Sequence, residues 1–125
     1  MESKEPRADR SRMANGVLIL ARSAIAALLA FGAWMFLLHG RRWFERPDRP
    51  DWARVLLCWA EIVGAFLFAF PRTAAAGALV LLSALAWAAG FHFALGQSTG
   101  MLWPDFAIVA TLAVITHARK AGEMR

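Results

Sequence analysis

The sequence predicts an all-α fold, a polytopic membrane protein built as a bundle of four transmembrane helices. Of the 125 residues, 59% are hydrophobic, which exceeds the share of about 45–50% that is usual in soluble domains. The mean hydropathy is +0.47. The apolar residues form long blocks, and nearly all of the charged residues lie between these blocks. Because a soluble chain would gather its apolar surface in one core, this pattern indicates membrane spans.

Four apolar blocks are long enough to cross about 30 Å of hydrocarbon. They cover residues 17–39, 52–70, 74–95 and 102–117. The first block is too long for the apolar part of a signal peptide and ends in a basic sequence, so we expect a retained anchor. The predicted membrane domain covers residues 14–118. It lies between a disordered cytoplasmic tail at 1–13 and a basic cytoplasmic tail at 119–125.

The connections between the blocks differ in character. Residues 40–51 combine two prolines with mixed charge, which predicts a solvated loop. A Pro-Arg-Thr hairpin joins the second and third spans, where Pro71 ends one helix and Thr73 is expected to cap the next. Residues 96–100 form a short polar link. Asp105 then falls in the first turn of the last helix, where the macrodipole favours a negative charge.

The distribution of basic residues predicts the orientation. An even number of spans puts both termini on one side of the membrane. That side carries Lys4, Arg7, Arg10, Arg12, Arg72, Arg119, Lys120 and Arg125, against Arg41, Arg42, Arg46, Arg49 and Arg54 on the other. The more basic side is expected in the cytoplasm. The arginine- and alanine-rich composition looks like that of a GC-rich bacterial genome, so we expect a bacterial inner-membrane protein. The basic residues flank apolar blocks, which predicts a lipid bilayer as partner and no nucleic acid.

Glu61 is the candidate functional residue that stands out most. It lies in the middle of the second span, where an ionisable side chain costs about 2.5–3.5 kcal/mol. At 100° per residue it shares a helix face with the small residues Cys58 and Gly64, opposite the bulky Trp59 and Phe66. We therefore expect Glu61 to point into the bundle. Cys58 is interpreted as a small apolar filler, and a single cysteine excludes an intrachain disulfide.

Arg22 is the predicted partner of Glu61 in a buried polar pair. It lies five residues into the first span from the cytoplasmic side, and Glu61 lies nine residues from the same side. At 1.5 Å per residue their depths differ by about 6 Å, which an arginine side chain can bridge. The alternative is that Arg22 extends to the headgroups while Glu61 is protonated.

Three further polar residues, His39, His92 and Asp105, are weaker candidates near the outer boundary. One interpretation is a metal, haem or quinone site, and the other is interfacial histidines with an aspartate at a helix start. Their spacing matches no ligand motif, so we expect no metal site. The sequence shows no catalytic triad, phosphate loop or paired carboxylates, which predicts no catalytic residues and no enzyme activity of the chain alone.

The second and third spans resemble the DoxX-like family of small four-helix membrane proteins. The resemblance rests on Glu61, Gly64, the Pro71-Arg72-Thr73 hairpin, the alanine-rich helix after it and His92, with looser matches at Arg22 and Gly40-Arg41. Some members are membrane subunits linked to thiosulfate:quinone oxidation, and others associate with oxidative-stress enzymes. The resemblance therefore implies a soluble or membrane oxidoreductase subunit as partner and a quinone as the one conceivable cofactor.

Three functions remain open on the sequence. The first is a non-catalytic accessory subunit of a redox- or quinone-linked assembly. The second is a small proton-coupled transporter that uses Glu61 as its protonation site. The third is a structural membrane assembly factor, in which Glu61 and Arg22 only specify helix packing. Co-purifying subunits, the transport activity of a Glu61→Gln variant and the abundance of a Glu61→Ala variant would distinguish them.

Overall fold

The structure is a computed structural model that describes residues 5–40 and 51–124. The described residues form α1 (Glu5–His39), α2 (Asp51–Ala69), α3 (Ala74–Ala94) and α4 (Leu102–Glu123). The predicted all-α class is confirmed, and α2 and α3 begin and end within one residue of the predicted spans. Most of the predicted solvated loop, residues 41–50, lies outside the described residues.

Three of the helices are long and apolar enough to cross a membrane, which indicates a membrane protein. They are α1 from Arg7 to His39, α2 and α3. The last helix, α4, has 22 residues, but Asp105 lies in its first turn and Lys120 in its last. These charges shorten the apolar stretch, so α4 is present as a helix without being shown as a fourth span.

Two helices extend further into the predicted tails than expected. Residues 5–13 belong to α1, so the prediction of a disordered tail over 1–13 is wrong for the described part of that segment. At the other end, α4 continues to Glu123 through the predicted basic tail. Ala8, Arg10 and Met13 are good helix formers, and extending an existing helix costs far less than nucleating a new one.

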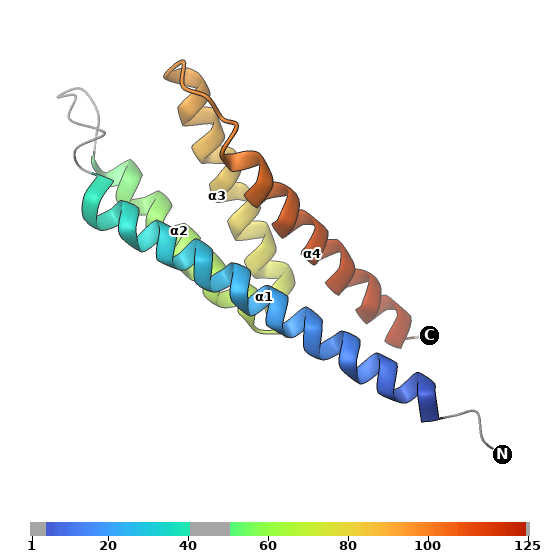
Figure 1. Ribbon diagram of the computed structural model, residues 1–125. Coiled ribbons are helices and arrows are strands. Elements are labelled where there is room, and N and C mark those ends of the chain that lie inside the picture. The colour runs from blue at the N-terminus through green and yellow to red at the C-terminus, as the bar shows by residue number, and fades with distance from the viewer. Residues whose placement is uncertain (1–4, 41–50, 125) are drawn as a thin grey trace.

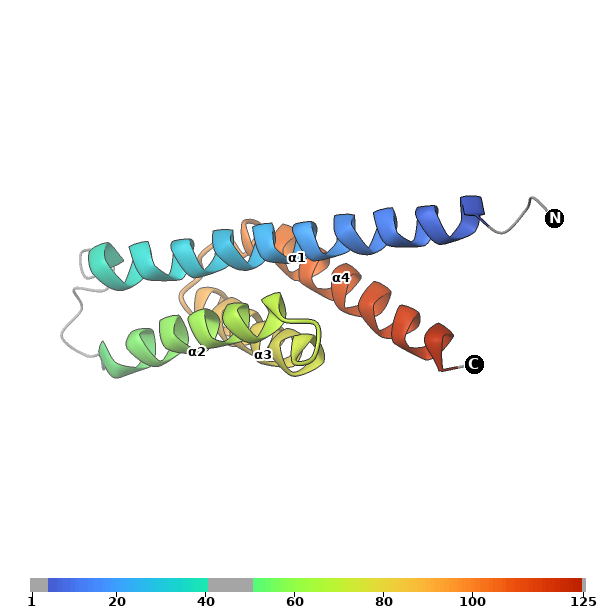
Figure 2. The same cartoon turned by 90° about the horizontal axis from the view of Figure 1, so that it is seen from below.

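The four helices form an open arrangement of two pairs. Helix α2 packs against both α1 and α3, whereas α4 packs mainly against α3 and has few contacts with α1. The pair α1–α2 and the pair α3–α4 approach each other near the α2–α3 connection and splay apart toward their other ends (Figure 1). Seen from below, α1 and α4 cross at an angle (Figure 2). The bundle is therefore incompletely closed between α1 and α4.

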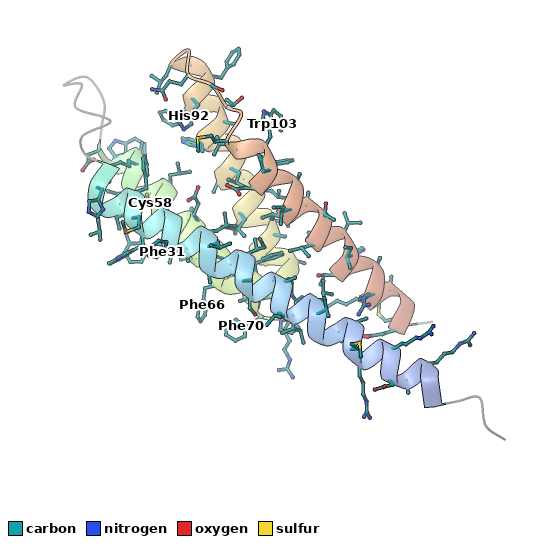
Figure 3. The ribbon with its side chains drawn as sticks, viewed as in Figure 1. Phe31, Cys58, Phe66, Phe70, His92 and Trp103 are labelled. Atoms are coloured by element: carbon teal, nitrogen blue, oxygen red, sulfur yellow. The ribbon has the colours of Figure 1, made fainter. Side chains whose placement is uncertain are left out.

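Bulky apolar side chains cover the outer surface of the bundle. Phe31, Phe66 and Phe70 point away from the helices (Figure 3) and are 64%, 66% and 51% exposed. In water such a surface would drive aggregation, but lipid tails accommodate it without cost. The outward position of Phe66, with Cys58 and Gly64 buried, confirms the predicted faces of α2.

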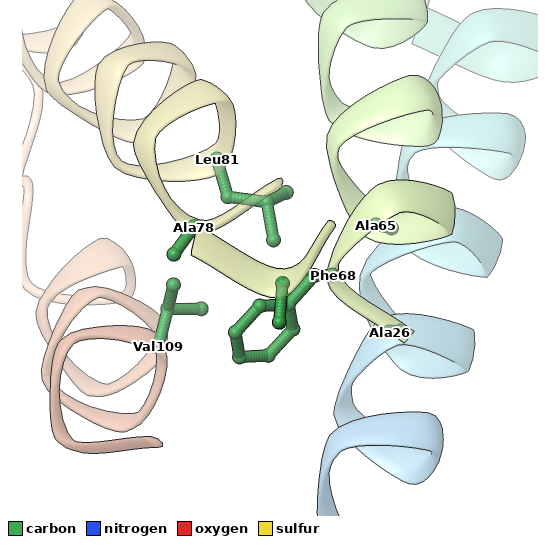
Figure 4. Close-up of a cluster of buried hydrophobic side chains, with 7 residues drawn as sticks. Ala26, Ala65, Phe68, Ala78, Leu81 and Val109 are labelled. Atoms are coloured by element: carbon green, nitrogen blue, oxygen red, sulfur yellow. The ribbon is translucent and has the colours of Figure 1, made fainter. Parts of the chain in front are cut away.

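The core is small and contains three large side chains among alanines. Phe68 of α2, Leu81 of α3 and Val109 of α4 are fully buried. They meet between the two helix pairs, with alanines such as Ala26 and Ala65 at the edges (Figure 4). Alanine lets helix backbones approach, and Phe68 fills the space that remains between three helices. This cluster positions α4 against the rest of the bundle.

Small residues allow close backbone contact at the turn between α2 and α3. A Cβ atom added at Gly77 would lie 2.2 Å from the backbone nitrogen of Phe68. Among the described glycines, Gly77 has the closest neighbouring backbone, although the sequence patterns did not single it out. On α3, the small residues Ala84 and Ala88 are buried, whereas Ala86 and Gly90 are exposed.

The hairpin between α2 and α3 is present, but Thr73 has a different role from the predicted one. Its side chain makes no capping hydrogen bond to α3. Instead, Oγ1 donates a hydrogen bond of 2.7 Å to the carbonyl of Leu67. The close contact at Gly77 brings the start of α3 onto the end of α2, and the hydroxyl then satisfies an orphan carbonyl of α2.

Arg54 connects the beginning of α2 to the end of α1. It is only 8% exposed. Nη1 donates to the carbonyls of Phe36 and Leu37 at 3.2 and 2.8 Å, and Nε and Nη2 donate to Oδ1 of Asp51 at 3.0 and 2.8 Å. A cation at the last carbonyls of a helix satisfies these acceptors and opposes the negative end of the macrodipole. This contact sets the register of α1 on α2.

We expect Arg54→Met to lower the free energy of unfolding by about 1–3 kcal/mol, because the carbonyl of Leu37 and the carboxylate of Asp51 lose their donor. Unfolding of the purified protein by SDS in mixed micelles measures this change. Arg54→Lys should give an intermediate loss, since an ammonium group cannot reproduce the fork of the guanidinium. Equal stability of all three proteins would contradict the proposed role of Arg54.

Candidate functional site

Glu61 lies halfway along α2 and is partly buried. The adjoining face of α2 contains the buried residues Cys58, Gly64 and Ala65. The carboxyl group therefore belongs to the inner face of the helix, as predicted. Within the described residues, Glu61 makes no ion pair. The ion pair found among these residues joins Arg54 and Asp51.

Arg22 is one of the most deeply buried polar residues of the described chain, with 2% of its surface exposed. Its Nε atom has no hydrogen-bond partner in the described structure. A buried cationic side chain without an acceptor is costly, and in membranes such residues usually pair with another group. The burial of Arg22 argues against the alternative in which it extends to the headgroups, but the predicted contact with Glu61 is not formed.

The register of α1 on α2 explains why Arg22 and Glu61 stay apart. The hydrogen bond from Arg54 to the carbonyl of Leu37 aligns these two positions. Arg22 precedes Leu37 by 15 residues, whereas Glu61 follows Arg54 by seven, so the two side chains are offset by about 12 Å along antiparallel helices. By the same register, Arg22 lies level with the end of α2 near Ala69.

Asp105 is the charged group that acts electrostatically on Glu61. It lies in the first turn of α4 and is partly buried. Helix register supports the same proximity. Arg119 donates a hydrogen bond to Asn15, and this contact places the start of α4 at about the height of residue 30 in α1. The Arg54 contact places Glu61 at the same height. The sequence showed no paired carboxylates, yet the fold brings these two together.

The two candidate histidines, His39 and His92, lie near the ends of two different helices, α1 and α3. His39 is exposed, and its Nδ1 is 3.2 Å from the carbonyl of Met35 in the same helix. His92 lies near the link between α3 and α4 (Figure 3), with Nδ1 2.9 Å from Oε1 of Gln97. Among the residues that the structure describes, no three His, Cys, Asp or Glu side chains are placed to hold a metal ion.

The turn after α3 explains the position of His92. Gly96 has a φ of 66°, a left-handed conformation that glycine adopts without strain. The amide of Gly96 donates to the carbonyl of Phe93 at 3.0 Å, and that of Gln97 donates to the carbonyl of His92 at 2.9 Å. These two bonds form a Schellman motif. Both the backbone and the side chain of His92 therefore terminate a helix.

Cys58 is a buried free thiol, 1% exposed, close to α1 (Figure 3). It lies on the buried face of α2 together with Gly64, Ala65 and Phe68. This environment agrees with the interpretation of Cys58 as a small filler.

An apolar groove runs between α2 and α3, with a volume of about 370 Å³. Leu57, Ala60, Leu79 and Trp87 line it, and Ser83 supplies a hydroxyl group. Small-molecule sites are usually concave and apolar with few polar groups, which this groove matches. Ala60 precedes Glu61 in the chain, but neither Glu61 nor Asp105 is among the residues that line the groove.

Two residues of the site were not assigned their observed roles from the sequence. Asp105 was considered as a helix-start residue or as part of a site with His39 and His92. Its interaction with Glu61 was not predicted, because it depends on how α4 packs. Arg54 was counted only as a flanking charge. The spacing of Asp51 and Arg54, three residues apart at a helix start, is the local signal that could have indicated their ion pair.

Comparison of the chain with protein-family models, with curated proteins and with solved structures gave no match.

Proposed function

We propose that this chain is a DoxX-like integral membrane protein that serves as a non-catalytic accessory subunit of a redox- or quinone-linked assembly. The observation that carries the proposal is the partly buried carboxyl group of Glu61, halfway along a helix that is long and apolar enough to cross a membrane. Ionisable residues at membrane depth mark proton relays and ligand sites.

A carboxyl group inside the bundle suits quinone chemistry at membrane depth. Reduction of a quinone to a quinol takes up two electrons and two protons. In the proposed arrangement a partner oxidoreductase supplies both electrons, the aqueous phase supplies both protons, and Glu61 passes each proton on and is then reprotonated. The groove beside Ala60 and Ser83 would hold the quinone ring, with Trp87 against its face.

In the proposed topology all four helices cross the bacterial inner membrane. An unbroken fourth span puts both termini on the same side of the membrane, the cytoplasm. The excess of basic residues on the side of the termini supports this orientation. Reporter fusions after His39, Thr73 and Gln97 test it, and a cytoplasmic signal after Gln97 would contradict the proposed orientation.

We expect Glu61→Gln to reduce quinone reduction by at least about tenfold, as loss of a proton-transfer group does. Membranes from a deletion strain, complemented with each variant, provide the assay. Asp105→Asn should show a smaller loss. Glu123→Gln is the matched control, because Glu123 is an exposed carboxylate at the far end of α4.

The amount of protein in each membrane, measured by immunoblot, separates chemistry from folding. Activity of Glu61→Gln equal to that of Glu123→Gln, at equal amounts, would contradict the proposed role. A fall in amount that matches the fall in activity would favour the structural assembly factor instead.

The same carboxyl group favours a proton-coupled transporter as the second candidate. In that case the purified chain alone, in vesicles loaded with a pH-sensitive dye, would couple proton movement to a substrate. Glu61→Gln would abolish this coupling. Proton flux without any partner would replace the accessory-subunit proposal, whereas flux that is insensitive to Glu61→Gln would exclude the transporter.

A further inference from the structure

We propose that the groove between α1 and α4 binds one acidic phospholipid, with an acyl chain along the groove and the phosphate at Arg10 and Arg119. This inference is independent of the proposed redox function. It concerns a face of α1 that adjoins the one packed on α2, and it arises because α4 has few contacts with α1.

The groove consists of two adjoining stretches of about 490 and 450 Å³. Both stretches share Ala21 of α1 and Leu112 of α4, so they form one continuous channel. Its lining is almost entirely apolar, with Val17 and Leu18 toward one end and Ile108 toward the other. The small side chain of Ala21 leaves the channel open at the point where the two stretches meet.

Charge is confined to one end of this channel. Arg10 and Arg119 line the first stretch from opposite helices. Arg119 donates a hydrogen bond to Asn15, a neutral partner that orients the guanidinium without compensating its charge. In the described part of the chain neither arginine forms an ion pair. Two guanidinium groups at one mouth are well suited to bind phosphate oxygens.

The length of the groove matches one leaflet. From Arg10 to Ile25, the last residue of α1 that lines it, α1 rises by about 22 Å. One leaflet with its headgroups is about 20–22 Å thick. A phospholipid whose phosphate lies at the arginines would therefore extend its acyl chain to Ile25 and Ile108. Basic pockets between transmembrane helices favour acidic headgroups, because a headgroup ammonium would be repelled by the arginines.

The test is native mass spectrometry of the full chain in mild detergent with added phosphatidylglycerol or phosphatidylcholine of identical acyl chains. We expect preferential retention of phosphatidylglycerol, and a roughly fivefold fall in that preference for Arg10→Gln and again for Arg119→Gln. Arg72→Gln, in the exposed α2–α3 hairpin, should leave the preference unchanged. Ala21→Trp should weaken binding of both lipids, because the indole blocks the channel.

Asn15→Ala controls for the fold, since it removes the hydrogen bond to Arg119 while keeping both charges, and it should retain most of the preference. Arg10 makes no contact on which folding depends, so its variant tests the proposal even if Arg119→Gln is unstable. Equal retention of the two lipids by the wild-type protein would overturn the proposal. So would a loss in Arg72→Gln as large as that in Arg10→Gln, which would indicate a general effect of surface charge.

Discussion

Gly77→Ala is expected to lower the free energy of unfolding by about 1–3 kcal/mol, the cost of overpacking a tight contact. The new methyl group would meet three backbone atoms of α2, namely N and Cα of Phe68 and the carbonyl carbon of Leu67, at 2.2, 2.6 and 2.7 Å. Backbone atoms cannot turn away as a side chain would, so α3 must shift. That shift would also disturb the hydrogen bond from Thr73 to Leu67 and the burial of Phe68.

Gly90→Ala is the matched control for this prediction. Gly90 lies in the same helix, and no atom lies within 4 Å of a Cβ added there. Its substitution should leave stability unchanged or raise it slightly, because alanine favours helix more than glycine does. SDS unfolding in mixed micelles measures both variants. If the two substitutions had equal effects, the close approach of α3 to α2 at Gly77 would be disproved.

Arg22→Met is expected to raise the free energy of unfolding by about 1–3 kcal/mol, the usual cost of a buried unpaired polar group. Methionine keeps the apolar length of the side chain and removes the guanidinium, whose Nε has no acceptor. Replacement of buried charges by apolar residues of similar size is often neutral or stabilising. If Arg22→Met stabilises the protein, the guanidinium of Arg22 has a role other than stability.

Arg72→Met provides the comparison, because Arg72 is an exposed arginine in the hairpin at the same end of the bundle. Surface substitutions of this kind change stability by no more than about 0.5 kcal/mol. The same micelle titration applies to both variants. Destabilisation by Arg22→Met, with Arg72→Met neutral, would contradict this prediction. It would show that Arg22 makes a stabilising polar contact.

Local features of the fold were predictable from the residues. The helix of α2 and its two faces follow from the spacing of Cys58, Gly64 and Phe66, which depends only on the helical period. The Pro71 hairpin follows from the missing amide of proline. The helical start of α1 was missed because charged residues near a terminus were taken as disordered, although a long helix was already nucleated beside them.

The amino-acid sequence by itself determined which segments are helical and which are apolar enough for a membrane, because these properties depend on residues close together in the chain. Only the tertiary structure decided which polar groups meet. The Arg54 contact sets the register that separates Arg22 from Glu61, and the packing of α4 brings Asp105 close to Glu61. Such distances depend on how whole helices slide and tilt against one another, which the pattern within a single helix does not contain.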